Sequence, residues 1–570
     1  MANILTPTQI WSDFKVAFIP TAEVVSERKK GEAVFQRIKI EGRKTRDGQV
    51  KIAAVLVRGV QLGVTPAVIL AQDFNKPLQD ELAISLVKQG YTVLIVDLAG
   101  KRTADDREAA ENDFYTQYPD SIAYSNYIQT AQKLYTFEGS VTKSCWYEWC
   151  AAVRYAIAYL DSLPYVTSIG AVGIGEGATV IWHTAATDDN LSCATFLLNA
   201  GWRVYNGLNK FGEQVVPEFT DSVMRVLAGV EPQSYAPHVK CPTYTVVSLN
   251  DALYDSDRAD DTVSRTGETV YSAFDYSVGT LGYVGAENLK SISLFLKEFL
   301  LKANRVALGM PLEVEAKCDV KDGAIEIEVT PDKTNLEKVV LYAAEGEERS
   351  HLRAWVRVAD GKQKDGVYTF RYQPYQKSGL ATFFARATYK GGFTVSSNTI
   401  SKRFNEEEIA PTHKAAVLYS SRFDLGESIF VSAADKENLQ QSGICFNQKN
   451  AVVEKSGPMG IYGAYCSGGL SSFCVNAERY KPTDSSMLMF DVAVRKETTL
   501  AVKLIADFFG ERLEYVARVS LKGGNIWHNV KLEMPNFKLE NGMGLKSYEK
   551  IQAIQFVADN DFILNNVLWV

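Results

Sequence analysis

The stretch GAVGIGEGATVIW, residues 170–182, carries the strongest structural signal in the chain. An apolar run flanked by small residues leads into Gly-x-Gly-x-Gly, and a helix-like segment follows. This layout is typical of a strand that turns sharply into a helix. Glycine suits the turn, because a positive φ there costs a residue with a Cβ about 1–3 kcal/mol. The stretch therefore predicts a strand-to-helix turn centred on Gly175.

Strand-like and helix-like segments alternate on both sides of this turn, up to about residue 305. Buried-strand runs are PAVILAQ (66–72), YTVLIVDLAG (91–100), ATFLLNA (194–200), YTVVSLND (244–251) and TVYSAF (269–274). Helical periodicity marks LQDELAISLVKQG (78–90), WYEWCAAVRYAIAYL (146–160) and LKSISLFLKEFLLK (289–302). The alternation predicts a mainly parallel sheet with helices on both faces.

After ALGMP (307–311) the pattern changes to period-two alternation without helical segments. AIEIEVTP, KVVLYAAE, ATFFARATYK and FTVSSNTISKRF predict a sandwich of immunoglobulin-like size over 311–404. NEEEIAPT (405–412) is typical of a linker, and TLAVKLIADFF and EYVARVSL indicate a second, larger sandwich over 413–570. The predicted fold class is multidomain α/β plus all-β, with an α/β domain over 1–305.

Composition limits the classes of function. At 570 residues the chain is too long for one core. With 61 Lys and Arg against 68 Asp and Glu, and no basic block, nucleic acid and anionic membrane are not expected partners. The opening MANILTPTQIWSDFKVAF lacks the pattern of a secretory leader, and no run reaches membrane-spanning length. We expect a soluble, cytoplasmic protein.

The eight cysteines are scattered and form none of the close Cys/His pairs that structural zinc requires. The sequence therefore predicts neither a metal site nor a bound cofactor, and favours reduced, buried thiols. Cys466 and Cys474 could pair across a hairpin, but only in an oxidising compartment.

The first segment resembles the α/β-hydrolase superfamily, nearest to its dienelactone hydrolase and acetyl xylan esterase branches, over most of residues 34–302. Four features carry the resemblance: QGYTVLIVDLAG, the helix WYEWCAAVRYAIAYLDSLPYV, the turn at Gly175, and CPTYTVVSLND. It implies an α/β-hydrolase fold and a triad of serine, acid and histidine in chain order. The residues two positions before and two positions after the nucleophile must be small, and Gly173 and Gly177 meet this requirement.

The sequence departs from this triad at two of its three positions. Gly175 occupies the nucleophile position, and Asp251 fills the acid position. No histidine occurs between His238 and His351, and His238 precedes the acid-bearing strand, at the wrong end of the sheet. His183 lies on the helix after the turn, where the apolar stripe favours a core residue over a base.

Ligands of open α/β sheets bind beyond the carboxyl ends of the strands. An insertion over 103–144, rich in tyrosine, follows one of these strands and is expected to cap the crevice, although its tyrosines could simply pack onto the domain. Glu176 is also a candidate catalytic carboxylate, or only a helix cap. The predicted ligand-binding residues are Gln72, Asp73, Asn75, Tyr115, Tyr118, Glu176, Trp202 and Asp251.

These observations favour a non-catalytic binding or scaffolding protein, with a small-molecule or carbohydrate-derived ligand. The C-terminal sandwich resembles galactose-binding-like jelly rolls through NIWHNVKLEMPNFK (525–538) and ILNNVLWV (563–570). One alternative is an active esterase in which Glu176 or Asp251 activates water, or Cys145 is the nucleophile. Another is a structural protein whose sandwiches mediate homo-oligomerisation.

Overall fold

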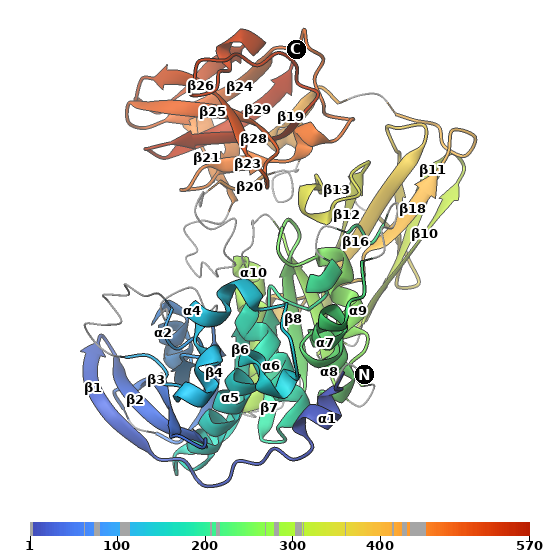
Figure 1. Ribbon diagram of the computed structural model, residues 1–570. Coiled ribbons are helices and arrows are strands. Elements are labelled where there is room, and N and C mark those ends of the chain that lie inside the picture. Colours follow the sequence, from blue (N-terminus) through green and yellow to red (C-terminus); the bar gives the residue numbers. More distant parts are fainter. Residues whose placement is uncertain are drawn as a thin grey trace.

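The computed structural model contains an α/β part followed by two β-sandwiches, coloured blue to green, yellow and red in Figure 1. It describes residues 4–61, 63–72, 80–102, 114–205, 208–211, 217–267, 270–278, 284–301, 310–311, 313–358, 361–412, 415–423, 430–433 and 452–570. The predicted fold class is confirmed. Within these residues, no helix combines the length and apolar character needed to cross a membrane.

The α/β part is built on one sheet, whose described strands run in the spatial order β1-β2-β3-β5-β4-β6-β7-β8-β9. The strands from β5 to β9 in this order are mutually parallel, whereas β1, β2 and β3 pair antiparallel. Their bounds are β1 Ala22–Lys30, β2 Ala33–Lys44, β3 Gln49–Gly59, β4 Thr65–Ala71, β5 Thr92–Val96, β6 Val166–Ile174, β7 Leu191–Leu197, β8 Thr243–Ser248 and β9 Ser272–Ser277.

Helices cover both faces of this sheet, as the alternating pattern predicts. On one face, α5 (Cys145–Asp161) and α6 (Glu176–Thr187) bury Trp149 and Ile181 against alternate residues of the strands. On the other face, α2 (Asp80–Lys88) and α10 (Ala286–Leu296) bury Leu86 and Phe295. The other α-helices of the described residues are α1 Pro7–Trp11, α4 Tyr127–Thr130, α7 Asp221–Gly229, α8 Pro232–Tyr235 and α9 Ala259–Val263.

The last strand, β9, begins three residues later than the TVYSAF run indicates. Asp275 and Ser277 lie within it and are fully buried polar residues. Hydrophobic patterning cannot identify such positions, because their burial depends on partners from another part of the chain.

Each β-sandwich consists of two antiparallel sheets. In the first, the described strands are β10 Val314–Lys321, β11 Ala324–Pro331, β12 Leu336–Glu345, β13 Val356–Arg357, β14 Lys362–Lys364, β15 Val367–Tyr372, β16 Gly379–Tyr389, β17 Phe393–Ser396 and β18 Ile400–Phe404. In the second they are β19 Val417–Tyr419, β20 Val431–Ser432, β21 Val453–Ser456, β22 Tyr462–Tyr465, β23 Leu470–Ser472, β24 Leu488–Val494, β25 Thr498–Ala506, β26 Leu513–Leu521, β27 Ile526–Leu532, β28 Ile551–Ala558 and β29 Phe562–Trp569.

The first sandwich packs on the edge of the α/β sheet. Phe274 and Tyr276 of β9 share one buried cluster with Tyr342 of β12 and Phe384 of β16. The second sandwich contacts the first through a smaller cluster that contains Leu352 and Phe508. The sandwich edge therefore lies beside the carboxyl ends of β8 and β9, where a ligand crevice is expected.

Candidate functional site

The turn after β6 has the predicted strand-to-helix form. Gly175 precedes α6 with φ 57° and ψ −123°, a backbone conformation that favours glycine. Its N–H donates to the Leu197 carbonyl, at 3.0 Å. Its carbonyl accepts from Asn199 Nδ2, also at 3.0 Å, and the same Nδ2 donates to Thr179 Oγ1 at 2.9 Å. The buried Asn199 thus braces the turn from the end of β7.

The flanking glycines satisfy the expected steric requirement. A Cβ on Gly173 would lie 2.5 Å from the Ala178 Cα, and a Cβ on Gly177 would lie 2.2 Å from the Ala71 carbonyl oxygen. No side chain fits at either position unless the backbone moves. These contacts show that the turn requires glycine on both sides of Gly175.

Asp251 follows β8 and is 7% exposed. Its Oδ1 accepts from the N–H groups of Leu253, at 2.7 Å, and Tyr254, at 3.2 Å. Its Oδ2 has no hydrogen-bond partner among the described residues. Burial raises the pKa of Asp251 to about 6, although these two hydrogen bonds and Arg203 act in the opposite direction.

Arg203 is the residue that sequence reasoning missed at this edge of the sheet. Its guanidinium carbon lies 5.0 Å from the ring centroid of Tyr135 and 5.2 Å from that of Tyr254, and Nη1 donates to the Leu253 carbonyl at 2.7 Å. Its charge acts on both Asp251 and Glu176. A guanidinium stays protonated in proteins, so it cannot act as a general base.

A second buried carboxylate, that of Glu231, accepts a hydrogen bond from the backbone of Arg203. Glu231 is fully buried and accepts from the N–H groups of Arg203, at 3.2 Å, and Val204, at 3.1 Å. Burial raises the pKa of Glu231 to about 7. Two acids with raised pKa values around one permanent cation form a polar cluster of the kind often found at functional sites.

His183 is a core residue, as its position on the apolar stripe of α6 predicts. It is 1% exposed, its Nε2 donates to the Val230 carbonyl at 2.6 Å, and its ring stacks on Tyr235 at 3.8 Å. Burial lowers the pKa of His183 to about 4. The ring N–H of His183 is therefore used in a hydrogen bond to a backbone carbonyl within the core.

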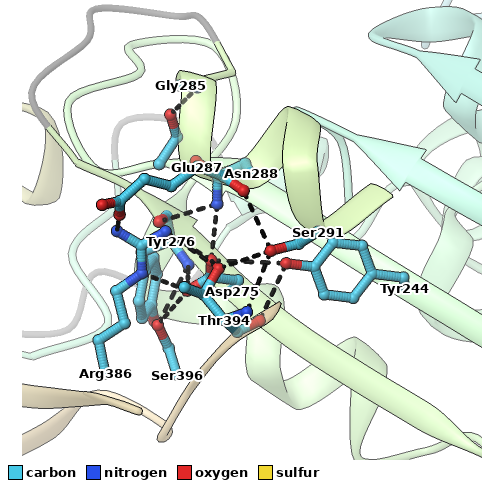
Figure 2. Close-up of polar contacts among 11 residues, drawn as sticks. Tyr244, Asp275, Tyr276, Gly285, Glu287, Asn288, Ser291, Arg386, Thr394 and Ser396 are labelled. Carbon is cyan, nitrogen blue, oxygen red and sulfur yellow. Dashed lines mark hydrogen bonds and ion pairs between the residues drawn. The ribbon is translucent and has the colours of Figure 1, made fainter. Parts of the chain in front are cut away.

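The strand β9, after which the resemblance implies a histidine, is bound to the first sandwich through Asp275 (Figure 2). Asp275 accepts from Arg386 Nε at 3.1 Å and Nη2 at 2.8 Å, and from the hydroxyls of Thr394 and Ser396, each at 2.6 Å. Asn288 Nδ2 donates to it from α10 at 2.6 Å. The polar groups of this strand end thus serve attachment of the sandwich.

The other predicted site residues lie in different surroundings. Gln72 is buried at the end of β4, and a Cβ on Gly177 would lie 3.0 Å from its backbone nitrogen. Trp202 has a positive φ of 63°, and its Nε1 donates to Thr262 Oγ1 at 2.9 Å. Asp73 and Asn75 lie outside the described residues.

The insertion contributes one tyrosine to the cluster and uses others for packing. Tyr135 lies against Arg203, as described above, and Glu176 adds to the effect of burial in raising the pKa of Tyr135. Tyr118 instead donates to the Leu98 carbonyl at 2.7 Å, and packs on the core that lies under α5. Tyr115 is half-buried, and residues 103–113 lie outside the described part.

The comparisons with known proteins returned similar structures but no family. No family model matches the chain, and no curated protein matches its sequence. Acetyl xylan esterase 1 from a Thermoanaerobacterium species is 13% identical, with a TM-score of 0.38, and the match covers 52% of this chain and 93% of that one. An acetyl xylan esterase from a Paenibacillus species is 11% identical, with a TM-score of 0.37, and the match covers 52% of this chain and 92% of that one. A glucuronoyl esterase from Solibacter usitatus is 11% identical, with a TM-score of 0.30, and the match covers 43% of this chain and 72% of that one.

Proposed function

We propose that this protein has an α/β-hydrolase fold without serine-hydrolase activity, and that it binds a small polar ligand in the crevice beside the turn. The observation that supports the proposal is the backbone of Gly175, the residue that the resemblance assigns to the nucleophile position, with φ 57°. A residue with a Cβ at such a φ is strained by about 1–3 kcal/mol, and glycine relieves this strain. Loss of the hydroxyl together with relief of strain is expected where nucleophilic attack no longer matters.

The surrounding groups are also unsuited to activate a nucleophile. A serine hydroxyl is a weak nucleophile until a base takes its proton, and such assistance contributes about 10²- to 10⁴-fold. Arg203, the cation beside Asp251, cannot accept a proton. His183 is 1% exposed in the core, and burial lowers its pKa to about 4, so it is a weak base.

A carbohydrate-derived ligand suits the residues that remain. Tyr135 is partly exposed and offers an aromatic ring, and Glu176, Asp251 and Arg203 supply acceptors and donors. Aromatic faces combined with a few polar groups are the usual means of orienting a small ligand in a cleft. The ligand would therefore be bound and released without bond cleavage.

The test is hydrolysis of 4-nitrophenyl acetate by the native protein and by Gly175→Ser. We expect no turnover above background in either protein, because the sequence has no histidine between His238 and His351, where the base for the added hydroxyl is expected. Calorimetric titration with a panel of neutral monosaccharides then tests binding, and Trp202→Ala should weaken any binding in the crevice.

A second function is favoured by one observation, the unpartnered Oδ2 of Asp251 and its pKa of about 6. Such a carboxylate could activate water without a serine. Native turnover of the ester that is abolished by Glu176→Gln or Asp251→Asn would replace the proposal with this hydrolase. Rescue of turnover by Gly175→Ser alone would equally contradict it, because a base would then lie within reach of the turn.

A further inference from the structure

A cavity of about 390 Å³ lies where the α/β part and the two sandwiches meet. The α/β part contributes Asn209, the first sandwich contributes residues 346–349 and Gln376, and the second contributes residues 476–478, beside the 3₁₀ turn η13 (Cys474–Asn476). Ligand sites commonly have volumes of about 300–1,000 Å³ and often lie between domains. The cavity therefore has the size and the position of a small-molecule site.

The charged side chains that line this cavity are already paired. The pairs are Glu347 with Arg349, Glu348 with Arg403, and Glu478 with Lys481. Arg349 donates from Nε and Nη2 to the two carboxylate oxygens of Glu347, at 2.8 and 2.7 Å. A charged ligand would find no unpaired counter-ion here, and removing an unpaired charge from water is costly. The lining thus favours an uncharged ligand.

A hydrogen bond between the two sandwiches joins two walls of the cavity. Asn476 Nδ2 donates to Glu347 Oε2 at 2.6 Å. The Glu347 side chain also carries the ion pair with Arg349 and is only 12% exposed. These walls are held in place before a ligand arrives, so binding requires little ordering of side chains.

Two side-chain amides of the lining, those of Asn209 and Gln376, have no hydrogen-bond partner among the described residues. Both residues are partly exposed, so a ligand can reach them. The Gln376 N–H donates to Glu345 Oε1 at 2.7 Å, which fixes the backbone beside the cavity. Gly346 has a φ of 84°, and a Cβ there would lie 3.2 Å from Gln376 Nε2, so glycine keeps room beside this amide. Each amide therefore offers a carbonyl acceptor and an NH₂ donor group to a ligand.

We propose that this cavity binds an uncharged polyhydroxy molecule of the size of a mono- or disaccharide, through hydrogen bonds to Asn209 and Gln376. A hydroxyl both donates and accepts, so two neighbouring hydroxyls can satisfy the carbonyl oxygen and the NH₂ group of one amide. Neither Trp202 nor Glu176 lines the cavity, which makes it a site separate from the crevice beside the turn. Since the ligand contacts all three parts of the chain, its binding should raise the thermal unfolding midpoint.

The experiment is calorimetric titration of the full chain with lactose and with myo-inositol. Cyclohexanol, which has the carbon ring of myo-inositol with a single hydroxyl, is the matched control ligand and should bind at least tenfold more weakly. Gln376→Met and Asn209→Leu remove the amides at nearly constant side-chain size, and each should weaken binding of the polyols at least tenfold. Gln363→Met should not, because Gln363 is exposed on β14, outside the cavity.

Two further variants separate this cavity from the crevice. Ala477 lines the cavity, and Ala477→Leu should abolish binding while it retains every polar group and an unfolding midpoint close to that of the native chain. Trp202→Ala, which tests the crevice, should leave binding in the cavity unchanged.

The inference is wrong if neither polyol binds, or if cyclohexanol binds as tightly as myo-inositol. It is also wrong if binding is lost in Trp202→Ala but kept in Gln376→Met and Ala477→Leu, a result that would leave the proposed function standing. Ester turnover abolished by Asp251→Asn would overturn the proposed function instead, and would leave the cavity untouched.

Discussion

Arg386 on β16 forms a two-pronged ion pair with Asp275 on β9, and both side chains are buried. Nε and Nη2 of the arginine each donate to a different carboxylate oxygen, the geometry for which a guanidinium is suited. Nη1 donates to Glu287 of α10 at 2.7 Å. One sandwich residue therefore binds the last strand and the last helix of the α/β part (Figure 2).

Replacing Arg386 should lower the free energy of unfolding of the protein. Arg386→Met leaves Asp275 buried without its cation, and breaking a buried pair in this way costs about 3–5 kcal/mol. Urea unfolding should show a lower midpoint for this variant. The matched control is Lys402→Met, whose partner Asp319 has an exposed side chain, and its midpoint should be unchanged. Equal effects of the two substitutions would show that Arg386 does not hold the two parts together.

The close approach at Gly177 should make it intolerant of any side chain. In Gly177→Ala the new Cβ would meet the Ala71 carbonyl at 2.2 Å, so the backbone of β4 or α6 must move. Overpacking of this kind costs about 1–3 kcal/mol. Gly63→Ala is the control, because a Cβ there meets nothing within 4 Å. A free energy of unfolding for Gly177→Ala equal to that of the control would contradict this account of the turn.

We expect the buried His183 to lower the free energy of unfolding in mild acid. Its pKa is about 4 in the folded chain against 6.5 as the ordinary value, so below pH 6.5 the unfolded chain binds a proton that the folded chain excludes. The free energy of unfolding should therefore drop by about 2 kcal/mol more between pH 7 and pH 5 than it does in His183→Gln, at 1.36 kcal/mol per pKa unit.

The comparison with His183→Gln isolates this histidine. Buried acids such as Asp251 and Glu231, whose pKa values are raised, change stability in the opposite direction, but they do so in both proteins. Urea unfolding of the two proteins across this pH range measures the difference. Parallel pH profiles would indicate that His183 is protonated within the folded core.

The thiols should be inert until the chain unfolds. Seven cysteines lie in the described part without a disulfide, and six of these are buried: Cys145, Cys150, Cys193, Cys241, Cys466 and Cys474. Burial raises the pKa of Cys145 and Cys150 to about 12, so little reactive thiolate forms near neutral pH.

A thiol-reactive dye should thus label six of the eight cysteines only after urea is added. Cys318 is half-buried, and Cys445 lies outside the described residues, so the prediction concerns only the other six. Labelling of more than two thiols in the native protein would contradict the burial described here. Labelling of only six in urea under non-reducing conditions would instead reveal a disulfide such as Cys466–Cys474.

The turn at Gly175 and the acid at Asp251 were predictable because local sterics and chain order determine them. Gly173 is required by a local contact, with Ala178 of the helix that follows, whereas Gly177 is required by the close approach of Ala71 on the neighbouring strand β4. Asp251 was predictable in the same way, since an acid directly after a strand must lie at the carboxyl edge of a parallel sheet.

The charge cluster and the cavity, by contrast, depend on distant parts of the chain. Arg203 reaches Asp251 only because the segments after β7 and β8 meet at one edge of the sheet. His351 and Asp251, a hundred residues apart in the chain, line a second, smaller cavity because the first sandwich packs on the edge of the sheet. No local pattern encodes such meetings, since the burial of a charged side chain becomes favourable only when a distant partner pairs with it. Local residue preference therefore decided the shape of the turn, and packing between segments decided which charges surround it.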